Sequence, residues 1–96
     1  MANYYDSEAM KNGASKMEKE IAAFNKYRSN IDSIIDKLAK SWDDDNNRKY
    51  VALYRKEAAN SMEDASKKMT QYAELLKMCS RKYGNSIDSG NSNLTI

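Results

Sequence analysis

The sequence predicts an all-α protein that folds as an antiparallel two-helix hairpin. Three observations lead to this prediction: the 96-residue chain contains no proline, apolar residues recur at helical spacing in both halves, and the only tryptophan, Trp42, lies between the two halves. A proline-free stretch with a 3.5-residue apolar repeat is typical of a long, packed helix. We therefore expect a single small domain whose chain reverses once, at Trp42.

The first predicted helix spans about residues 7–41 and follows a flexible N-terminus, residues 1–6. Its apolar positions alternate steps of four and three residues, and Arg28 alone interrupts them. Asp6 and Ser7 are candidate N-caps, because their side chains accept hydrogen bonds from the first free amides of a helix. This first seam consists of Met10, Ala14, Met17, Ile21, Phe24, Arg28, Ile31, Ile35, Leu38 and Trp42.

The turn is predicted at about residues 42–45, where three consecutive carboxylates follow the tryptophan. Asp43, Asp44 and Asp45 at the start of a helix accept hydrogen bonds from free backbone amides and oppose the positive end of the helix dipole. Lys40 suits the negative end of the preceding helix. The sequence therefore specifies the turn from both sides.

A calcium site is the alternative use of these carboxylates. Asp43, Asp45 and Asn47 alternate like the first ligands of a helix-loop-helix calcium loop. That loop also needs glycine at its sixth position and glutamate at its twelfth, where this chain has Arg48 and Tyr54. We therefore predict helix capping and no metal.

The second predicted helix spans about residues 46–84. A single four-four step at Ala58 indicates a stutter in its repeat, and Gly84 is the expected left-handed C-cap. The polar residues 85–96 are predicted to form a flexible C-terminal tail. This second seam consists of Val51, Tyr54, Ala58, Met62, Ala65, Met69, Tyr72, Leu76, Cys79 and Tyr83.

Both predicted helices carry apolar residues beyond these seams. The resulting stripe is wider than one antiparallel neighbour covers, and a lone hairpin buries too little surface to be stable by itself. We therefore expect two hairpins to form a four-helix bundle, either as a homodimer or with a different partner. The predicted interface consists of Phe24, Tyr27, Ile31, Ile34, Leu53, Met62, Met69, Leu75 and Met78.

Composition argues against several classes of function. The chain has no histidine, one cysteine and no glycine-rich loop, so we expect no enzyme activity and no cofactor. Cys79 lies on the second seam and is interpreted as a small core residue. Mixed charges with a net charge of +2 argue against nucleic acid binding, and no apolar run is long enough for stable membrane insertion. The N-terminus also lacks the pattern of a secretory signal peptide.

Residues Ser41-Trp42-Asp43-Asp44, the aromatic Tyr50 and the second seam resemble the WXG family, the small early-secreted-antigen-like proteins of type VII secretion. The resemblance covers Ser7 to Gly84. In that family Trp-x-Gly forms the turn, so Trp42 corresponds to its tryptophan and Asp44 stands at its glycine. The resemblance implies a helical hairpin dimer that an ATPase-driven machinery of Gram-positive bacteria exports without a signal peptide.

The WXG family also tends to carry Tyr-x-x-x-Asp/Glu after the second helix as part of its export signal. Here Tyr83 and Asp88 are the candidate residues, with the acid one position late. Tyr4 and Glu8 match the spacing but lie at the other end of the chain. The signal is therefore either this degenerate pair or is supplied by a partner.

Three functions remain open from the sequence. The chain is an exported homodimer, a helper that pairs with a related hairpin or with the helical N-terminal domain of a larger secreted effector toxin, or a generic cytoplasmic helical adaptor. We favour the homodimer, because both seams are regular and self-sufficient. In the two export hypotheses the chain is cytoplasmic before the secretion ATPase acts on it, and is secreted afterwards.

Overall fold

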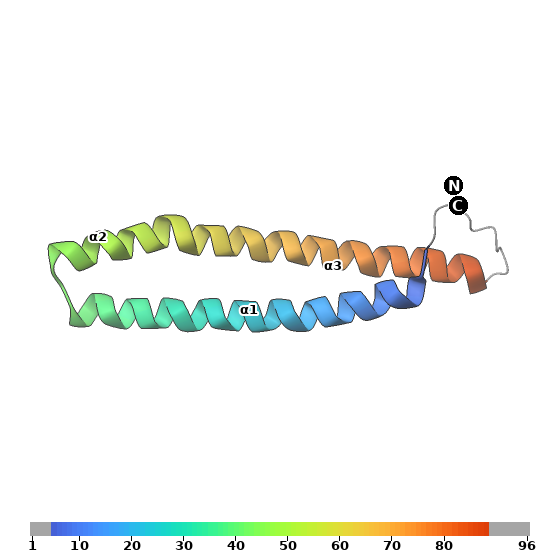
Figure 1. The fold of residues 1–96 in the computed structure, drawn as a ribbon, viewed down its shortest axis with the longest axis horizontal. Helices are drawn as coiled ribbons and strands as arrows, with labels where there is room; N and C mark the ends of the chain where they lie inside the picture. Colours follow the sequence, from blue (N-terminus) through green and yellow to red (C-terminus); the bar gives the residue numbers. More distant parts are fainter. Residues whose placement is uncertain (1–4, 89–96) are drawn as a thin grey trace. The chain divides into compact units, whose positions relative to one another are not determined.

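A computed structural model describes residues 5–88, with side chains described for residues 5–84. Within this range the secondary structure is entirely helical and contains no strand (Figure 1). The elements are α1 (Ser7–Ser41), α2 (Asp45–Leu53), the π-helix η1 (Tyr54–Ala58) and α3 (Ala59–Asp88). The predicted all-α class is therefore confirmed, and the predicted flexible segments 1–6 and 85–96 lie largely outside the described residues.

The N-terminus of α1 is capped by Asp6. Its carboxylate Oδ1 accepts a hydrogen bond from the amide of Ala9 at 3.0 Å, and its carbonyl accepts one from the amide of Met10 at 3.0 Å. These bonds satisfy amides that have no partner within the first turn of a helix. Of the two candidate N-caps, Asp6 is therefore the one used.

The segments α2, η1 and α3 follow one another without a break in helical backbone conformation. Leu53, Tyr54 and Ala59 all have right-handed helical dihedral angles. The amide of Ala59 donates to the carbonyl of Tyr54, five residues earlier, which is the hydrogen bond of a π turn. This turn takes up one extra residue at the place where the sequence predicted a stutter.

The predicted seam of the second helix is observed in part, because six of its residues after the π turn are half-buried: Met62, Ala65, Met69, Leu76, Cys79 and Tyr83. After the turn the buried or half-buried small residues lie seven positions apart, whereas the predicted seam placed the contact one residue earlier at each repeat. Ala58 and Tyr72 of that predicted seam are exposed. The small residues on the observed face are Ala59, Ser66, Ala73 and Ser80.

The chain divides into two compact units. The turn unit comprises residues 20–68, and the terminal unit comprises residues 1–19 and 69–96, of which 5–19 and 69–88 are described. Each unit contains part of α1 and part of the helix that follows the turn.

In the turn unit, polar side chains connect residues before the turn to residues after it in antiparallel order. The Tyr54 hydroxyl donates to Asp32, and the Ser66 hydroxyl donates to Oδ1 of Asn25 at 2.7 Å. An ion pair at 2.9 Å further joins Arg55 to Asp36. The buried side chains of this unit are Ile21, Asn47, Val51 and Ser66.

In the terminal unit, small residues line the contact between α1 and α3. Ala14 and Ala73 are each only 1% exposed, and the Ser80 hydroxyl donates to the carbonyl of Ser7 at 3.0 Å. Gly84 also faces Ser7, and an added Cβ would be 3.5 Å from the Ser7 hydroxyl oxygen, an ordinary contact distance. Small side chains let two helix backbones approach closely, which explains why large apolar residues are absent from these positions.

The prediction that the second helix ends at Gly84 is wrong, because α3 continues to Asp88. A left-handed C-cap was expected there, yet Gly84 lies inside the helix without a positive φ angle. Gly84 instead lies next to Ser7 at the start of α1, where an added Cβ would make only ordinary van der Waals contacts.

Replacement of Gly13 by alanine is expected to stabilise the protein by about 0.5–1 kcal/mol, since glycine inside a helix costs that much relative to alanine. The added Cβ would meet only the Cδ1 atom of Leu76, at 3.9 Å, which is an ordinary contact. Urea denaturation measures the change. Gly84→Ala is the comparison and should also gain stability, because its Cβ would likewise make only an ordinary contact, 3.5 Å from the Ser7 hydroxyl oxygen. A loss of stability in Gly13→Ala would contradict this packing.

Candidate interaction surfaces

Asp44 organises the turn between α1 and α2. Its backbone is extended, with φ −133° and ψ 173°, and its carboxylate accepts hydrogen bonds from the amide of Asn47 at 2.8 Å and the indole Nε1 of Trp42 at 2.7 Å. These two donors, the Asn47 amide first, lower the pKa of Asp44. Asp44 thus acts as the N-cap of α2, and it does not adopt the left-handed conformation that glycine favours.

Asn47 holds the same turn from the inside and was not singled out as a turn residue from the sequence. Its side chain is 8% exposed, and its amide nitrogen donates to the carbonyls of Trp42 at 2.7 Å and Leu38 at 3.3 Å. The Leu38 carbonyl lies in the last turn of α1 and also accepts the Trp42 amide at 2.8 Å, whereas Trp42 directly follows the helix. The sequence feature that could have identified Asn47 is its polar side chain at the third position of α2, where polar side chains often take part in helix capping.

The two remaining carboxylates of the turn pair with Arg48. Asp43 and Asp45 each form an ion pair with its guanidinium group, and the hydrogen bond to Asp45 is the main reason that the pKa of Arg48 is raised. Over residues 5–88 no group of three or more candidate metal-binding side chains comes together. Local pairing and capping therefore account for all three acidic side chains of the turn.

Four large apolar side chains form an exposed stripe on α1 in the turn unit. They lie at steps of four, three and four residues, which places them on one face of the helix. A segment of this length covers about 17 Å along the helix axis. This turn-unit stripe consists of Tyr27, Ile31, Ile34 and Leu38, which are 64%, 39%, 56% and 45% exposed.

The indole of Trp42 and two side chains of α2 are also exposed in the turn unit. Trp42 is 53% exposed although its Nε1 atom is bonded to Asp44, so its ring remains available to a partner. Tyr50 and Leu53 on α2 are 66% and 48% exposed. Exposed large apolar side chains of this kind are candidates for contact with a partner.

The terminal unit has an apolar patch of its own on α3. This terminal-unit patch consists of Tyr72, Leu75 and Met78, which are 54%, 46% and 57% exposed. Leu75 and Met78 line a shallow groove of about 340 Å³ together with polar side chains of the same helix.

The predicted interface residues fall into two groups by exposure. Six are exposed: Tyr27, Ile31, Ile34, Leu53, Leu75 and Met78. The other three are half-buried within their own unit: Phe24, Met62 and Met69. Leu38, Trp42 and Tyr72 were assigned to the intramolecular seams from the sequence, and the structure exposes them.

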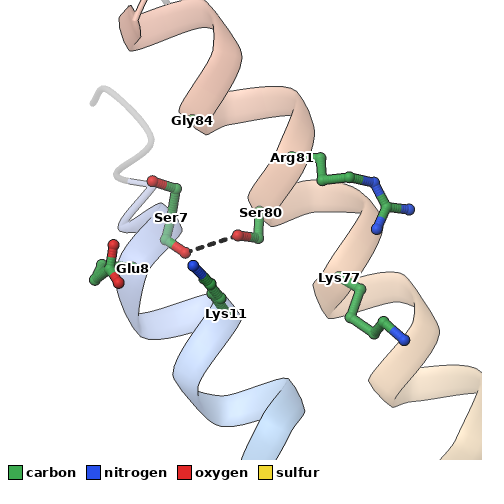
Figure 2. Close-up of a pocket in the computed structure, with 7 residues that line it drawn as sticks. All are labelled: Ser7, Glu8, Lys11, Lys77, Ser80, Arg81 and Gly84. Carbon is green, nitrogen blue, oxygen red and sulfur yellow. Dashed lines mark hydrogen bonds between the residues drawn. The ribbon is translucent and has the colours of Figure 1, made fainter.

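A second groove of about 450 Å³ lies between α1 and α3 in the terminal unit (Figure 2). Its walls carry hydroxyl and charged side chains, and the Ser80 hydroxyl is engaged with the carbonyl of Ser7. Lys77 forms ion pairs with Glu18 and Glu74, and the hydrogen bond that it donates to Glu18 is the main reason that its pKa is raised. The lining residues are Ser7, Glu8, Lys11, Lys77, Ser80, Arg81 and Gly84.

Tyr83, a candidate export-signal residue, stacks on Tyr5 in the terminal unit. Their ring centroids are 4.0 Å apart, and the ring planes differ by 18°. A hydrogen bond with Tyr5 is the main reason that the pKa of Tyr83 is raised. The ammonium group of Lys82 lies 5.6 Å from the centroid of the Tyr83 ring. Asp88, the other candidate signal residue, has a side chain outside the described residues.

Comparisons with protein-family models, with curated proteins and with solved structures found no match to this chain. Among the helices described between residues 5 and 88, none combines the length and the hydropathy that a membrane span requires. Hypotheses about function therefore depend on the sequence resemblance and on the surfaces described above.

Proposed function

We propose that this chain is an antiparallel helical hairpin that dimerises into a four-helix bundle, and that it is a small non-enzymatic cargo or helper of type VII secretion. The single observation that carries the proposal is the exposed turn-unit stripe on α1. Support also comes from the antiparallel order of contacts in the turn unit and from the resemblance to the WXG family.

The stripe supplies an energetic reason for association. Burying a half-exposed aliphatic or aromatic side chain stabilises a complex by about 1 kcal/mol. Two copies bring four such side chains each, and their combined contribution exceeds the smallest accepted cost of association, about 4 kcal/mol. The remaining exposed apolar residues, Trp42, Tyr50, Leu53 and the terminal-unit patch, extend the surface available to the second hairpin.

Trp42 and Asp44 give the proposed hairpin a rigid end. Because Asp44 caps α2 and also holds the indole of Trp42, the exposed ring is presented in one orientation. In the WXG-type hypothesis Trp42 marks the turn of the hairpin. Tyr83, near the C-terminal end of α3, contributes to the export signal. The chain leaves the cell folded, as a dimer that the secretion ATPase recognises.

The helper function uses the same surfaces with a different partner. In that case the turn-unit stripe covers the apolar face of the helical N-terminal domain of a larger secreted effector toxin, and the partner supplies the export signal.

An export assay in the native cell tests the proposal. The chain is measured in cells and in culture medium, in a strain with the secretion ATPase and in one without it, with a cytoplasmic protein as the lysis control. We expect the chain in the medium only when the ATPase is present. Its absence from the medium of both strains would contradict the cargo function, and co-export of one effector only when this chain is present would identify a helper.

A further inference from the structure

We propose that two copies of this chain pair through the turn-unit stripe in antiparallel order, with a two-fold axis between Ile31 and Ile34. Ile31 of one copy then faces Ile34 of the other. Tyr27 likewise faces Leu38. This inference rests on the proposed function, in which the chain is a dimer. It adds the orientation and the register of the two copies, which dimerisation by itself does not define.

The spacing of the turn-unit stripe is the same when it is read in either direction along α1. Its residues are separated by steps of four, three and four. A second copy that runs the opposite way therefore places an apolar side chain opposite each of the four. A two-fold interface needs this kind of self-complementary surface, in which each contact occurs twice. The stripe thus fits a second copy of itself over its whole length of about 17 Å.

Glu20 distinguishes this order from a parallel one. It is exposed and lies seven residues before Tyr27, close to the line of the stripe. In a parallel pair each residue faces its own copy, so the two Glu20 carboxylates would meet at a packed position and repel each other. In the antiparallel pair Glu20 lies at a level beyond Ser41, the last residue of α1 in the second copy. Its carboxylate therefore stays outside the stripe contact.

The residues at the two ends of the stripe also fix the register. A shift of seven residues in one direction would place Leu38 opposite the carboxylate of Glu20. A shift in the other direction would place Ile31 opposite Ser41 and leave Tyr27 beyond the end of the second α1. Only the register centred between Ile31 and Ile34 pairs every apolar side chain of the stripe with another.

The area of this contact is that of a small specific interface. Each copy contributes four large apolar side chains that are between 39% and 64% exposed. A large side chain has roughly 200 Å² of surface, so the two stripes remove on the order of 800 Å² from water. The exposed indole of Trp42, four residues after Leu38, adds to each end. The total approaches about 1,000 Å², the size that a specific interface between proteins needs.

Disulfide cross-linking between full-length variants tests the orientation. Cys79 is first replaced by serine, so that each variant carries a single thiol. Tyr27→Cys and Leu38→Cys are mixed in a glutathione redox buffer, and mass spectrometry separates the mixed disulfide from the two homodisulfides. We expect the mixed disulfide to exceed either homodisulfide by at least about tenfold. Identical thiols would lie about 16 Å apart along the helix axis, which is too far for a disulfide.

Ser29→Cys mixed with Asp36→Cys is the matched control in the same background. These two exposed positions lie at corresponding levels on either side of the axis, but about 180° away from the stripe. We expect no mixed disulfide from this pair. Ile31→Cys with Ile34→Cys is a second stripe pair and should also form the mixed disulfide. It replaces the first pair if circular dichroism shows that either of those variants has lost helix.

The results separate the register from the proposed function. Mixed disulfides from the stripe pairs alone would support the antiparallel pairing. Homodisulfides from Tyr27→Cys alone and from Leu38→Cys alone, or equal yields from stripe and control pairs, would overturn it. A dimer mass of the original chain in light scattering, without the mixed disulfides, would overturn the register and leave the dimer. A monomer mass at every concentration would overturn both.

Discussion

Replacement of Ile34 by glutamate is expected to weaken self-association of the chain by at least about thirtyfold, since burying an unpaired carboxylate in an apolar interface costs about 2 kcal/mol or more. Ile34 is 56% exposed in the isolated chain, so the substitution should leave the fold intact. Sedimentation equilibrium gives the dissociation constant, and circular dichroism gives the helical content.

Ser33→Glu is the matched control for this experiment. Ser33 is the exposed neighbour of Ile34 on the same helix, but it points about 100° away from the turn-unit stripe. The control adds the same charge and should change self-association by less than about threefold. Equal weakening by the two substitutions would mean that net charge, and not the apolar stripe, governs association.

Replacement of Asn47 by alanine is expected to reduce the free energy of unfolding by about 1–3 kcal/mol, because the two hydrogen bonds of its buried side-chain amide are lost. The lost bonds are those to the carbonyls of Trp42 and Leu38. Urea denaturation, followed by helical circular dichroism, measures the loss.

Asn46→Ala is the control for the turn. Asn46 is the exposed neighbour of Asn47, and a surface substitution of this kind should change stability by less than about 0.5 kcal/mol. If both variants lost the same stability, the buried amide of Asn47 would not be what holds the turn.

The turn was predictable from the sequence in its chemistry but not in its geometry. Three carboxylates after Trp42 indicated capping, and Asp44 does cap α2. The bond from Trp42 to Asp44 and the inward amide of Asn47 depend on where the end of α1 meets the start of α2. A linear pattern does not contain that position, so the main buried polar residue of the turn was missed.

The register of the contact faces was predicted for part of each helix. On α1, Ala14 and Ile21 are buried as expected, but the predicted seam residues Leu38 and Trp42 are exposed. A straight α-helix drifts by about 20° per heptad relative to a 3.5-residue repeat, so a seam drawn over four heptads leaves the contact face. The predicted seam was therefore most accurate in the first half of α1.

On the second helix the observed contact face begins to differ from the predicted seam at the π-helix, Tyr54–Ala58. The four-four step at Ala58 in the sequence is compatible with either a stutter in an α-helix or a π turn. After the π turn the buried residues are Ser66 and Ala73, which are too small to stand out in an apolar pattern. The spacing of seven residues between Ser66 and Ala73 places both on one face of the helix, but the apolar pattern did not reveal it because serine is polar and alanine is small.

The candidate interaction surfaces were predicted from the apolar residues of each helix that lie outside its main seam. That pattern identified Tyr27, Ile34 and Met78 in advance, and all three are exposed. It did not identify Tyr5, because the contact between Tyr5 and Tyr83 joins residues from the two ends of the described chain. Contacts between residues distant in the sequence are therefore not contained in such a pattern.

The most direct test of the proposed assembly is the molar mass of the full-length chain in solution, measured by light scattering over a range of concentrations. The chain mass is 11.0 kDa. If the exposed apolar faces pair two hairpins, the measured mass should approach twice that value as the concentration rises, and Ile34→Glu should return it to the monomer mass. A mass of 11.0 kDa at every concentration would contradict the homodimer on which the proposed export depends.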